Sequence, residues 1–323
     1  MKRNERRKRH EQRVQEVHVE HSEPKQTHHS ESKSIYYREY KKLLIIPMLM
    51  LIIALVLIGA KLATTGDFIN KGISLKGGTS VTALGENLDS KIIETQLKSE
   101  YSSTEINVRT LENSGHQVGV LIESDILPED NQTSNSFIES IQKVTGIQRD
   151  NLSIETIGQT LGDAFFKQTL VAILIAFIFM GIVVYLYFRT AVPSAAVILA
   201  AFSDIVVTVA ILNILGLKVG TAGIAALLML IGYSVDTDIV LSTRVLKRKE
   251  GTVYQRVIGA MKTGLTMNIT TLGAVVIGLF IAESAVLQEI MLIVLIGLLV
   301  DLVNTWIQNA GILRWYMEKK GEI

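Results

Sequence analysis

The chain has 323 residues, of which 48% are hydrophobic, and it carries 32 basic and 31 acidic side chains. Its formal net charge of +1 therefore singles out no class of partner, and we expect no nucleic acid among them. Cysteine is absent, which excludes disulfides, thiolate metal sites and thiol nucleophiles. Any chemistry must come from carboxylates, hydroxyls, amides or histidines.

Residues 1–40 form a charged, histidine-rich segment with almost no aliphatic clusters. Such a segment cannot bury enough apolar surface to offset the entropy of ordering, so we expect a disordered cytoplasmic tail. Six of its first nine residues are basic, which is typical of a topology determinant more than of a lipid or RNA contact. His28 and His29 are expected to be solvated and not to bind a metal.

Six apolar segments are each long enough to cross ~30 Å of hydrocarbon as a helix. The basic region before the first is too long for a signal peptide, and five spans follow, so we expect that helix to be retained. The expected helices run from Leu43 to Ala60, Thr169 to Phe188, Ala191 to Leu215, Val219 to Ser242, Gly264 to Ala282, and Ile290 to Leu313.

The basic residues between these spans indicate the orientation, because cationic side chains are retained on the cytoplasmic side. They lie in the tail, between Arg244 and Lys262, and after the last span. The opposite connections hold Lys218 in one case and Glu283 and Glu289 in the other. We therefore expect a multi-pass protein of the cell membrane with both termini in the cytoplasm.

About a hundred residues between the first two spans must fold outside the membrane. Their order of elements, βαββαβ, predicts an extracytoplasmic α+β domain of ferredoxin-like type, with helices on one face of an antiparallel sheet. The expected strands are Thr79 to Leu84, Glu105 to Glu112, Gln117 to Glu123 and Leu152 to Ile157, and the expected helices are Leu88 to Tyr101 and Ser134 to Val144.

The expected organisation therefore has five parts. A tail over 1–40 is followed by the first membrane helix within 41–62, the extracytoplasmic domain over 63–163, membrane helices two to six over 164–316, and a cytoplasmic C-terminus over 317–323. The membrane part is an all-α bundle of six helices.

Four carboxylates lie far from the ends of the expected spans: Asp204, Asp236, Asp238 and Asp301. A charge near the bilayer centre costs at least ~2.5 kcal/mol, so such residues usually face a bundle interior and often mark ion or proton pathways. Burial disfavours the charged form of an acid, which suits reversible protonation. Asp236 and Asp238 are ~200° apart around a helix. We expect one to face the interior and the other a partner or the cytoplasmic rim.

Four neutral polar residues lie at comparable depth and could complete a polar cluster: Asn268, Thr270, Thr271 and Asn304. The alternative is that they only join helices, by contacts worth ~0.6 kcal/mol each. We favour this alternative for the neutral residues and an ion relay for the aspartates. A neutral side chain would join helices without the insertion cost of an acid.

Two enzymatic functions are excluded by the sequence. The segment from Gly72 to Thr79 has the glycine and threonine spacing of a phosphate loop, but Gly78 stands where the lysine belongs. The segment from Gly232 to Asp236 reads GYSVD and lacks the Gly-x-Gly-Asp pattern of intramembrane aspartyl proteases. We expect no enzyme activity, cofactor or metal, and any energy must come from an ion gradient or another protein.

Two segments resemble signatures of a known family. GISLKGGTSV, after the first span, and GYSVDTDIVLSTRVLKR, in the fourth, resemble signatures of the SecD and SecF protein-export membrane subunits. With the six spans, the chain resembles the SecF branch, and VDTDI with NITTLG looks like its archaeal type. The signature residues are Gly72, Lys76, Gly77, Gly78, Gly232 and Ser234.

The resemblance implies a member of the resistance-nodulation-division superfamily, embedded in the lipid bilayer. Such a subunit acts with SecD beside the SecY channel to promote export of unfolded polypeptides. In bacterial relatives an aspartate of the fourth helix is tied to proton-driven movement. The aspartate of bacterial SecF matches Thr237 of this chain, and that of SecD matches Asp236. A helix-five arginine matches Thr263, beside Lys262, and a helix-three histidine matches Ser203.

Two other functions remain open. A proton-coupled exporter of small molecules or lipids would belong to the same superfamily, but one loop domain and six spans look like half of a heteromeric complex. A passive assembly chaperone would need no ionisable residues in the membrane.

Overall fold

The computed structural model describes residues 38–113, 116–282 and 284–321. The expected tail up to residue 37, including His28 and His29, lies outside the described residues, as do Glu283 and the last two residues of the expected C-terminus. Residues 41–323 form one unit, separate from residues 1–40, and the architecture below is that of the larger unit. It begins within a short helix, α3 (Tyr40–Leu43).

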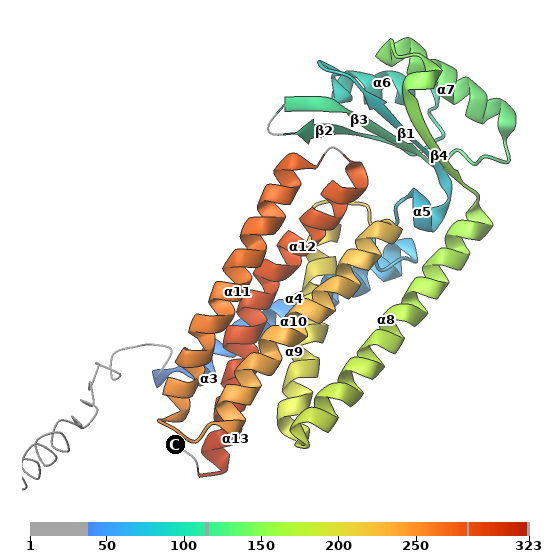
Figure 1. Ribbon diagram of the computed structural model, residues 1–323. Helices are drawn as coiled ribbons and strands as arrows, with labels where there is room; N and C mark the ends of the chain where they lie inside the picture. The colour runs from blue at the N-terminus through green and yellow to red at the C-terminus, as the bar shows by residue number, and fades with distance from the viewer. Residues whose placement is uncertain (1–37, 114–115, 283, 322–323) are drawn as a thin grey trace, which may run out of the picture. The chain divides into compact units, whose positions relative to one another are not determined.

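Six helical spans among the described residues are long and apolar enough to cross a membrane, which confirms the expected number (Figure 1). The chain is therefore a multi-pass membrane protein. The first five spans are α4 (Ile45–Thr65), α8 (Gln159–Phe188), α9 (Ala191–Ile214), α10 (Thr221–Lys247) and α11 (Val253–Ile281). The sixth runs through α12 (Ala285–Val303), a π-helical turn η3 (Asn304–Asn309) and α13 (Ala310–Lys319).

Several spans are longer than the sequence predicts. Helix α8 begins at Gln159 instead of Thr169, and α11 begins at Val253 instead of Gly264. Hydropathy marks only the part of a helix that lies in hydrocarbon, whereas hydrogen-bonded turns continue into water. At the start of α11, Thr252 forms a capping box that fixes the first turn.

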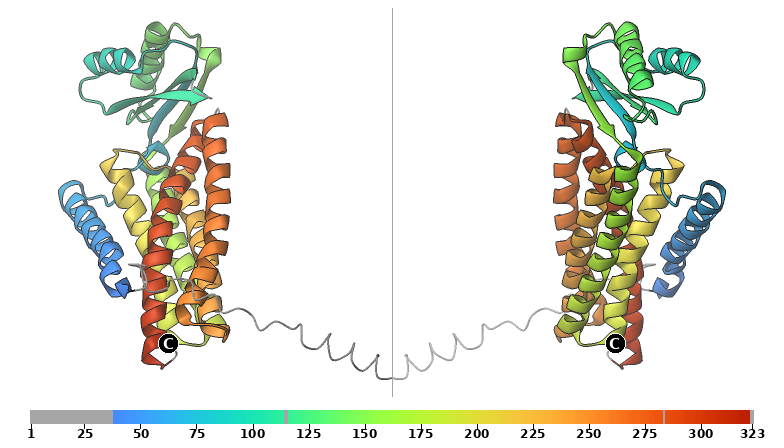
Figure 2. Two further views of the ribbon diagram at one scale, coloured as in Figure 1. Left: turned by 90° about the vertical axis from the view of Figure 1, so that its left-hand side faces the viewer. Right: turned by 90° about the vertical axis from the view of Figure 1, so that its right-hand side faces the viewer.

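Helices α9, α10 and α12 form the centre of the bundle, where they pack against one another. Helix α4 packs mainly on α9, and α8 packs on α9 and α10 (Figure 2). The outward faces of these two helices carry exposed apolar side chains such as Ile53, Phe179 and Leu186. Exposed apolar side chains on a spanning helix are suited to lipid.

The domain inserted between α4 and α8 contains the expected small antiparallel sheet. Its order is β2-β3-β1-β4, and every pair of neighbours is antiparallel. The strands are β1 (Gly78–Leu84), β2 (Ile106–Asn113), β3 (His116–Ser124) and β4 (Leu152–Ile157), and the helices are α6 (Ser90–Glu100) and α7 (Asn131–Thr145).

Helices α6 and α7 cover one face of this sheet, on the side away from the membrane helices (Figure 1). Leu97 of α6 and Phe137 of α7 pack with Val81 and Ile122 of the sheet in one hydrophobic core. Alternate strand residues therefore point away from this core, toward the ends of the membrane helices. That open face is part of a groove described below.

Candidate functional site

Three of the four expected carboxylates come together inside the bundle. Asp204 lies on α9, Asp238 on α10 and Asp301 on α12, and their exposed fractions are 1%, 0% and 0%. These are the three helices at the centre of the bundle. A buried carboxylate needs hydrogen-bond partners or a counter-charge, so its neighbours determine what it can do.

Both oxygens of Asp204 accept hydrogen bonds. The Ser234 hydroxyl donates to Oδ2 at 2.5 Å, and the Asn304 amide donates to Oδ1 at 2.8 Å. Asp301 accepts at Oδ2 from the Asn268 amide at 3.2 Å. The signature residue Ser234 and two of the four expected neutral residues are thus in the cluster.

Asp238 and Asp301 share one hydroxyl group. The Thr305 Oγ1 atom lies 3.0 Å from Asp238 Oδ1 and 2.9 Å from Asp301 Oδ1. A hydroxyl carries a single proton, so it either donates to one carboxylate or divides its proton between both, and a proton on either carboxyl group would complete two full hydrogen bonds. The arrangement can therefore hold a proton between α10 and α12.

The π turn in the last span supplies many of these partners. Asn304, Thr305, Gln308 and Asn309 all lie in it, and each is fully buried. Hydrogen bonds in a π-helix run from residue i to i+5, which widens the turn, and such turns are frequent at functional sites. Here Asn304 and Gln308 donate hydrogen bonds to residues of α9. Thr305 and Asn309 donate hydrogen bonds to Asp238 of α10.

Glycines allow the helices to approach closely at this level. A Cβ atom on Gly264 of α11 would overlap the indole ring of Trp306 in the π turn. A Cβ on Gly297 of α12 would similarly overlap the Leu230 side chain of α10. Small residues at such positions are how membrane helices bring polar groups within hydrogen-bonding distance.

Asp236 does not join the cluster. It is exposed on the outer side of α10, together with Gly232 and Tyr233, which is 38% exposed. No atom of a neighbouring element lies within 4 Å of a Cβ built on Gly232. The fourth carboxylate therefore lies on a face of α10 that no other part of the described chain covers.

Thr270 and Thr271 also lie away from the cluster. Their hydroxyls donate to the carbonyl oxygens of Thr266 and Met267, one turn earlier in α11. Such bonds satisfy a hydroxyl within its own helix. Of the expected neutral residues, only Asn268 and Asn304 contact the carboxylates.

The sequence analysis missed Thr305, Gln308 and Asn309. The available signal was the run NTWIQN, which places four side chains with amide or hydroxyl groups inside an otherwise apolar span. Regular α-helical spacing would spread these residues around the helix, and only the π turn gathers them.

Two positions that match bacterial functional residues carry hydroxyl side chains here, and each accepts a hydrogen bond. Ser203 accepts a hydrogen bond from Gln308 at 3.3 Å. Thr263 accepts one at 2.7 Å from Arg244, so the guanidinium near this position comes from α10 and not from α11.

The first signature segment lies at the junction between the inserted domain and the bundle. Its residues Ile73–Lys76 form a short helix, α5, which the sequence analysis did not predict. The Gly72 amide donates to the Val219 carbonyl at 2.9 Å, and the Thr221 amide donates to the Ser74 hydroxyl at 2.8 Å. The segment is therefore bonded to the loop that starts α10.

Glycines in this signature permit tight turns. Gly77 and Gly78 have φ angles of 89° and 135°, which side chains rarely adopt. A Cβ on Gly77 would lie 2.7 Å from the Cα of Gln159 at the start of α8, and one on Gly78 would overlap the Ser124 carbonyl oxygen. The two chain segments that enter and leave the domain thus cross in close contact.

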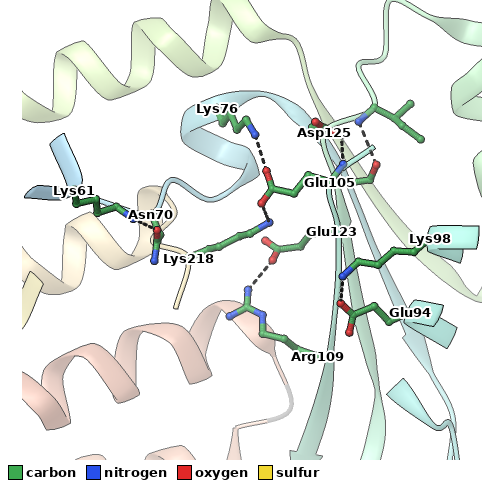
Figure 3. A network of polar contacts seen from close by, with 12 residues as sticks. Lys61, Asn70, Lys76, Glu94, Lys98, Glu105, Arg109, Glu123, Asp125 and Lys218 are labelled. Atoms are coloured by element: carbon green, nitrogen blue, oxygen red, sulfur yellow. Dashed lines mark hydrogen bonds and ion pairs between the residues drawn. The ribbon is translucent and has the colours of Figure 1, made fainter. Parts of the chain in front are cut away.

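A charged network holds the same junction (Figure 3). Glu105 at the start of β2 pairs with Lys76 of α5 at 2.8 Å and with Lys218, before α10, at 3.1 Å. The hydrogen bond from Lys76, aided by Lys218, lowers the pKa of Glu105 from 4.5 to about 2. The carboxylate is therefore charged throughout the neutral range and links the domain to two parts of the bundle.

A groove of about 770 Å³ lies between the open face of the sheet and the ends of α10 and α12. Arg109 and Glu123, paired at 2.9 Å, line it from β2 and β3 (Figure 3). Glu289 lines it from α12 and accepts a hydrogen bond from the Gly220 amide at 2.7 Å. The groove is thus lined by charged, hydroxyl and apolar side chains.

Within the part of the chain that the structure describes, no group of three or more histidine, cysteine, aspartate or glutamate side chains could hold a metal ion. The interior carboxylates are instead surrounded by neutral donors. Six membrane helices, a carboxylate cluster inside the bundle and one inserted α+β domain define the class: a multi-pass membrane protein with buried acids in its helix bundle.

Comparison with known proteins identifies the family. A family model described as "Protein export membrane protein SecD/SecF, C-terminal" matches residues 137–319. Two relatives, each called "Protein-export membrane protein SecF", come from Pyrococcus furiosus and Methanocaldococcus jannaschii. They are 39% and 40% identical, over 87% of this chain and over 92% and 96% of their own lengths. The chain therefore belongs to the SecD/SecF family of protein-export membrane proteins, as its two signatures indicate.

Solved structures share the fold. SecDF from Thermus thermophilus, described as a translocon-associated membrane protein, aligns with a TM-score of 0.66 and 21% identity. The alignment covers 86% of this chain and 38% of SecDF. A second SecDF structure, in a "super-membrane-facing" form, aligns with a TM-score of 0.56 and 20% identity over 87% of this chain and 39% of its own. This chain thus spans less than half of SecDF.

Proposed function

We propose that this chain is the SecF-type accessory subunit of the Sec translocation machinery, acting with SecD to promote export of proteins across the cytoplasmic membrane. The observation that carries the proposal is the match to proteins called SecF along more than nine tenths of their length. SecY and exported unfolded polypeptides are the further partners. The basic residues at one side of the spans support an orientation with both termini in the cytoplasm.

The inserted domain, expected over 63–163, is in our proposal extracytoplasmic and of ferredoxin-like type. The sheet order β2-β3-β1-β4 with both helices on one face supports this type. We place the contact with emerging polypeptide at the groove below the sheet, where Arg109, Glu123 and Glu289 offer charges beside apolar side chains.

The exposed face of α10 is our proposed contact with SecD. Asp236 would meet lipid there, at a cost of a few kcal/mol, unless another protein covers it. A partner helix that donates hydrogen bonds to this carboxylate removes that cost. We expect crosslinks from cysteines introduced at Gly232 or Tyr233 to reach SecD in native membranes.

We propose that Asp238, with Asp301 and Asp204, couples export to an ion gradient. The shared Thr305 hydroxyl supports this role, because a proton on either flanking carboxyl group would complete both of its contacts. Asp238→Asn preserves shape but removes the charge change, and we expect export to fall at least about tenfold and to lose its dependence on external pH.

Asp236→Asn is the matched comparison, two residues away on the same helix. If Asp236 serves the SecD contact, this variant weakens the crosslink to SecD and keeps the pH dependence of export. Normal export kinetics of Asp238→Asn at several external pH values, with Asp236→Asn alone impaired, would contradict the coupling role of the interior cluster. Normal export by Asp238→Asn is the result expected if the interior carboxylates only hold the helices together by hydrogen bonds.

A further inference from the structure

The two outer strands of the sheet differ in how their free edges are protected. In the order β2-β3-β1-β4, strands β2 and β4 each have a neighbour on one side only (Figure 1). The other side of such a strand carries a row of backbone N–H and C=O groups that can pair with another chain. Proteins usually protect such an edge with a bulge, a basic side chain, a proline or a covering element.

Strand β2 has several of these protections. Its register with β3 shifts between Leu111 and Glu112, which is typical of a β-bulge. The carbonyl oxygen of Glu112 accepts a hydrogen bond from the Gln288 side chain of α12 at 2.8 Å. Arg109 adds a basic side chain to the strand, and α11 packs against it. The edge at β2 is therefore occupied or distorted along part of its length.

Strand β4 lacks these protections. It pairs with β1 in one unbroken register, from Gly78 with Ile157 to Ala83 with Leu152. Its sequence, LSIETI, contains no proline or basic residue. Within the described residues, the backbone from Ser153 to Ile157 forms no hydrogen bond outside the sheet. Its exposed side chains include Thr156. The outer edge of β4 is thus open and regular.

This open edge borders the groove. Ser153, Glu155 and Ile157 of β4 line the groove, whereas Leu152 and Ile154 pack with the hydrophobic core on the other face of the sheet. A strand added beside β4 would follow the same pleat, so every second one of its side chains would enter the groove. Because the groove offers charged, hydroxyl and apolar side chains, it can accept side chains of several kinds.

We propose that an extended segment of an exported polypeptide pairs with the outer edge of β4 as a fifth strand of the sheet. The inference rests on the proposed export function and adds the way in which the polypeptide is bound. Exported polypeptides differ in sequence, but all carry backbone N–H and C=O groups, and pairing with a strand edge recognises those groups. A segment that is already folded has these groups paired, so the edge binds unfolded segments selectively.

Disulfide crosslinking in native membranes tests the pairing, with the full chain and an exported polypeptide that is stalled during export and carries a single cysteine. Thr156→Cys on β4 and Thr110→Cys on β2 are matched variants, because both threonines are exposed on outer strands. Thr110 lines the groove, whereas the side chain of Thr156 lies on the opposite face of the sheet from Glu155. A paired segment lies ~5 Å from β4 and about four strand spacings from β2, so Thr156→Cys should give at least about tenfold more crosslinked product.

Hydrogen exchange of the wild-type chain in lipid nanodiscs provides a second measurement that needs no variant. The probe is a synthetic peptide of alternating serine and valine. At saturation it should slow exchange at the outward amides between Ser153 and Ile157 at least about tenfold, because a paired strand protects them. Exchange in β2 should not change. The same peptide methylated on every backbone nitrogen cannot donate hydrogen bonds and should give no protection.

The outcomes separate this inference from the proposed function. Crosslinks at Thr110→Cys alone, or equal protection by the methylated peptide, would overturn the strand pairing and leave the groove as the contact with polypeptide. No crosslink to the polypeptide at either position, with no protection of β4, would overturn the proposed polypeptide contact as well. Crosslinks from Thr156→Cys to SecD or to a second copy of this chain, in place of the polypeptide, would also overturn the inference.

Discussion

Asp236 and Asp238 are two residues apart and meet opposite environments. Asp238 is fully buried against the π turn, whereas Asp236 is exposed on the outer face of α10. The position that the family resemblance marks for the helix-four acid falls at Asp236 or at Thr237. In this chain the acid that faces the interior is one or two residues further along, and it finds its partners in Thr305 and Asn309.

At the junction, a single residue carries two ion pairs. Glu105→Gln keeps the shape of the side chain and removes its pairs with Lys76 and Lys218. Because both Glu105 and Lys76 are about half exposed, we expect a loss of no more than about 1 kcal/mol in the free energy of unfolding. Faster hydrogen exchange at the Gly72 amide, which bonds to the same loop, would be the local measure.

The pH dependence of this contribution follows from the lowered pKa of Glu105. A depressed pKa stabilises the folded state above the ordinary value of 4.5, and the contribution is lost as pH falls from there to about 2. Wild type should therefore lose more stability than Glu105→Gln over this interval. Glu94→Gln, which breaks the Glu94 to Lys98 pair within α6, is the control and should leave exchange at Gly72 unchanged. Identical acid profiles of wild type and Glu105→Gln would refute the assignment.

Among the elements, the π turn is the feature on which the site depends. Four of its six residues contact or lie beside the carboxylates, and it joins two α-helical halves of one span. A π turn replaces the regular hydrogen bonds of an α-helix with bonds to i+5, which is less favourable. A helix therefore keeps such a turn where contacts with neighbouring helices stabilise it. Gly264 of α11 provides that support, because its missing side chain leaves room for Trp306.

Gly264→Ala should therefore destabilise the bundle, although alanine is the better helix former. Overpacking against a rigid indole ring costs typically about 1–3 kcal/mol, which exceeds the gain of up to ~1 kcal/mol in helix propensity. Gly273→Ala on the same helix meets no atom within 4 Å and should be neutral or stabilising. Thermal unfolding in nanodiscs measures both. Equal stabilisation by the two substitutions would show that Trp306 moves aside without cost.

At the scale of the whole molecule, the orientation in the membrane decides which side the groove faces. The chain has no natural cysteine, so single cysteines report accessibility directly. Ser103, Lys249 and Ser284 are all exposed, the first in the inserted domain and the other two at opposite ends of the bundle. An impermeant thiol reagent applied to intact cells should label cysteines at Ser103 and Ser284 only. Labelling at Lys249 would invert the proposed topology.

The sequence by itself determined the six spans, the antiparallel sheet and the family, because these depend on local composition, on alternation along each strand and on short signatures. It also determined that Asp236 and Asp238 point in different directions, since two residues rotate an α-helix by ~200°. Helical periodicity fixes only the angle between two side chains on one helix, so which of them faces inward depends on how α10 packs.

Only the tertiary structure decided the composition of the site. The contacts of Asp238 with Thr305 and Asn309 join residues that are 67 and 71 positions apart. They also require a π turn, which no regular hydrophobic period predicts. The link from Glu105 to Lys76 and Lys218 likewise joins the start of β2, helix α5 and the loop before α10. Such contacts depend on which helices, strands and loops pack against one another, and local sequence patterns do not predict that packing.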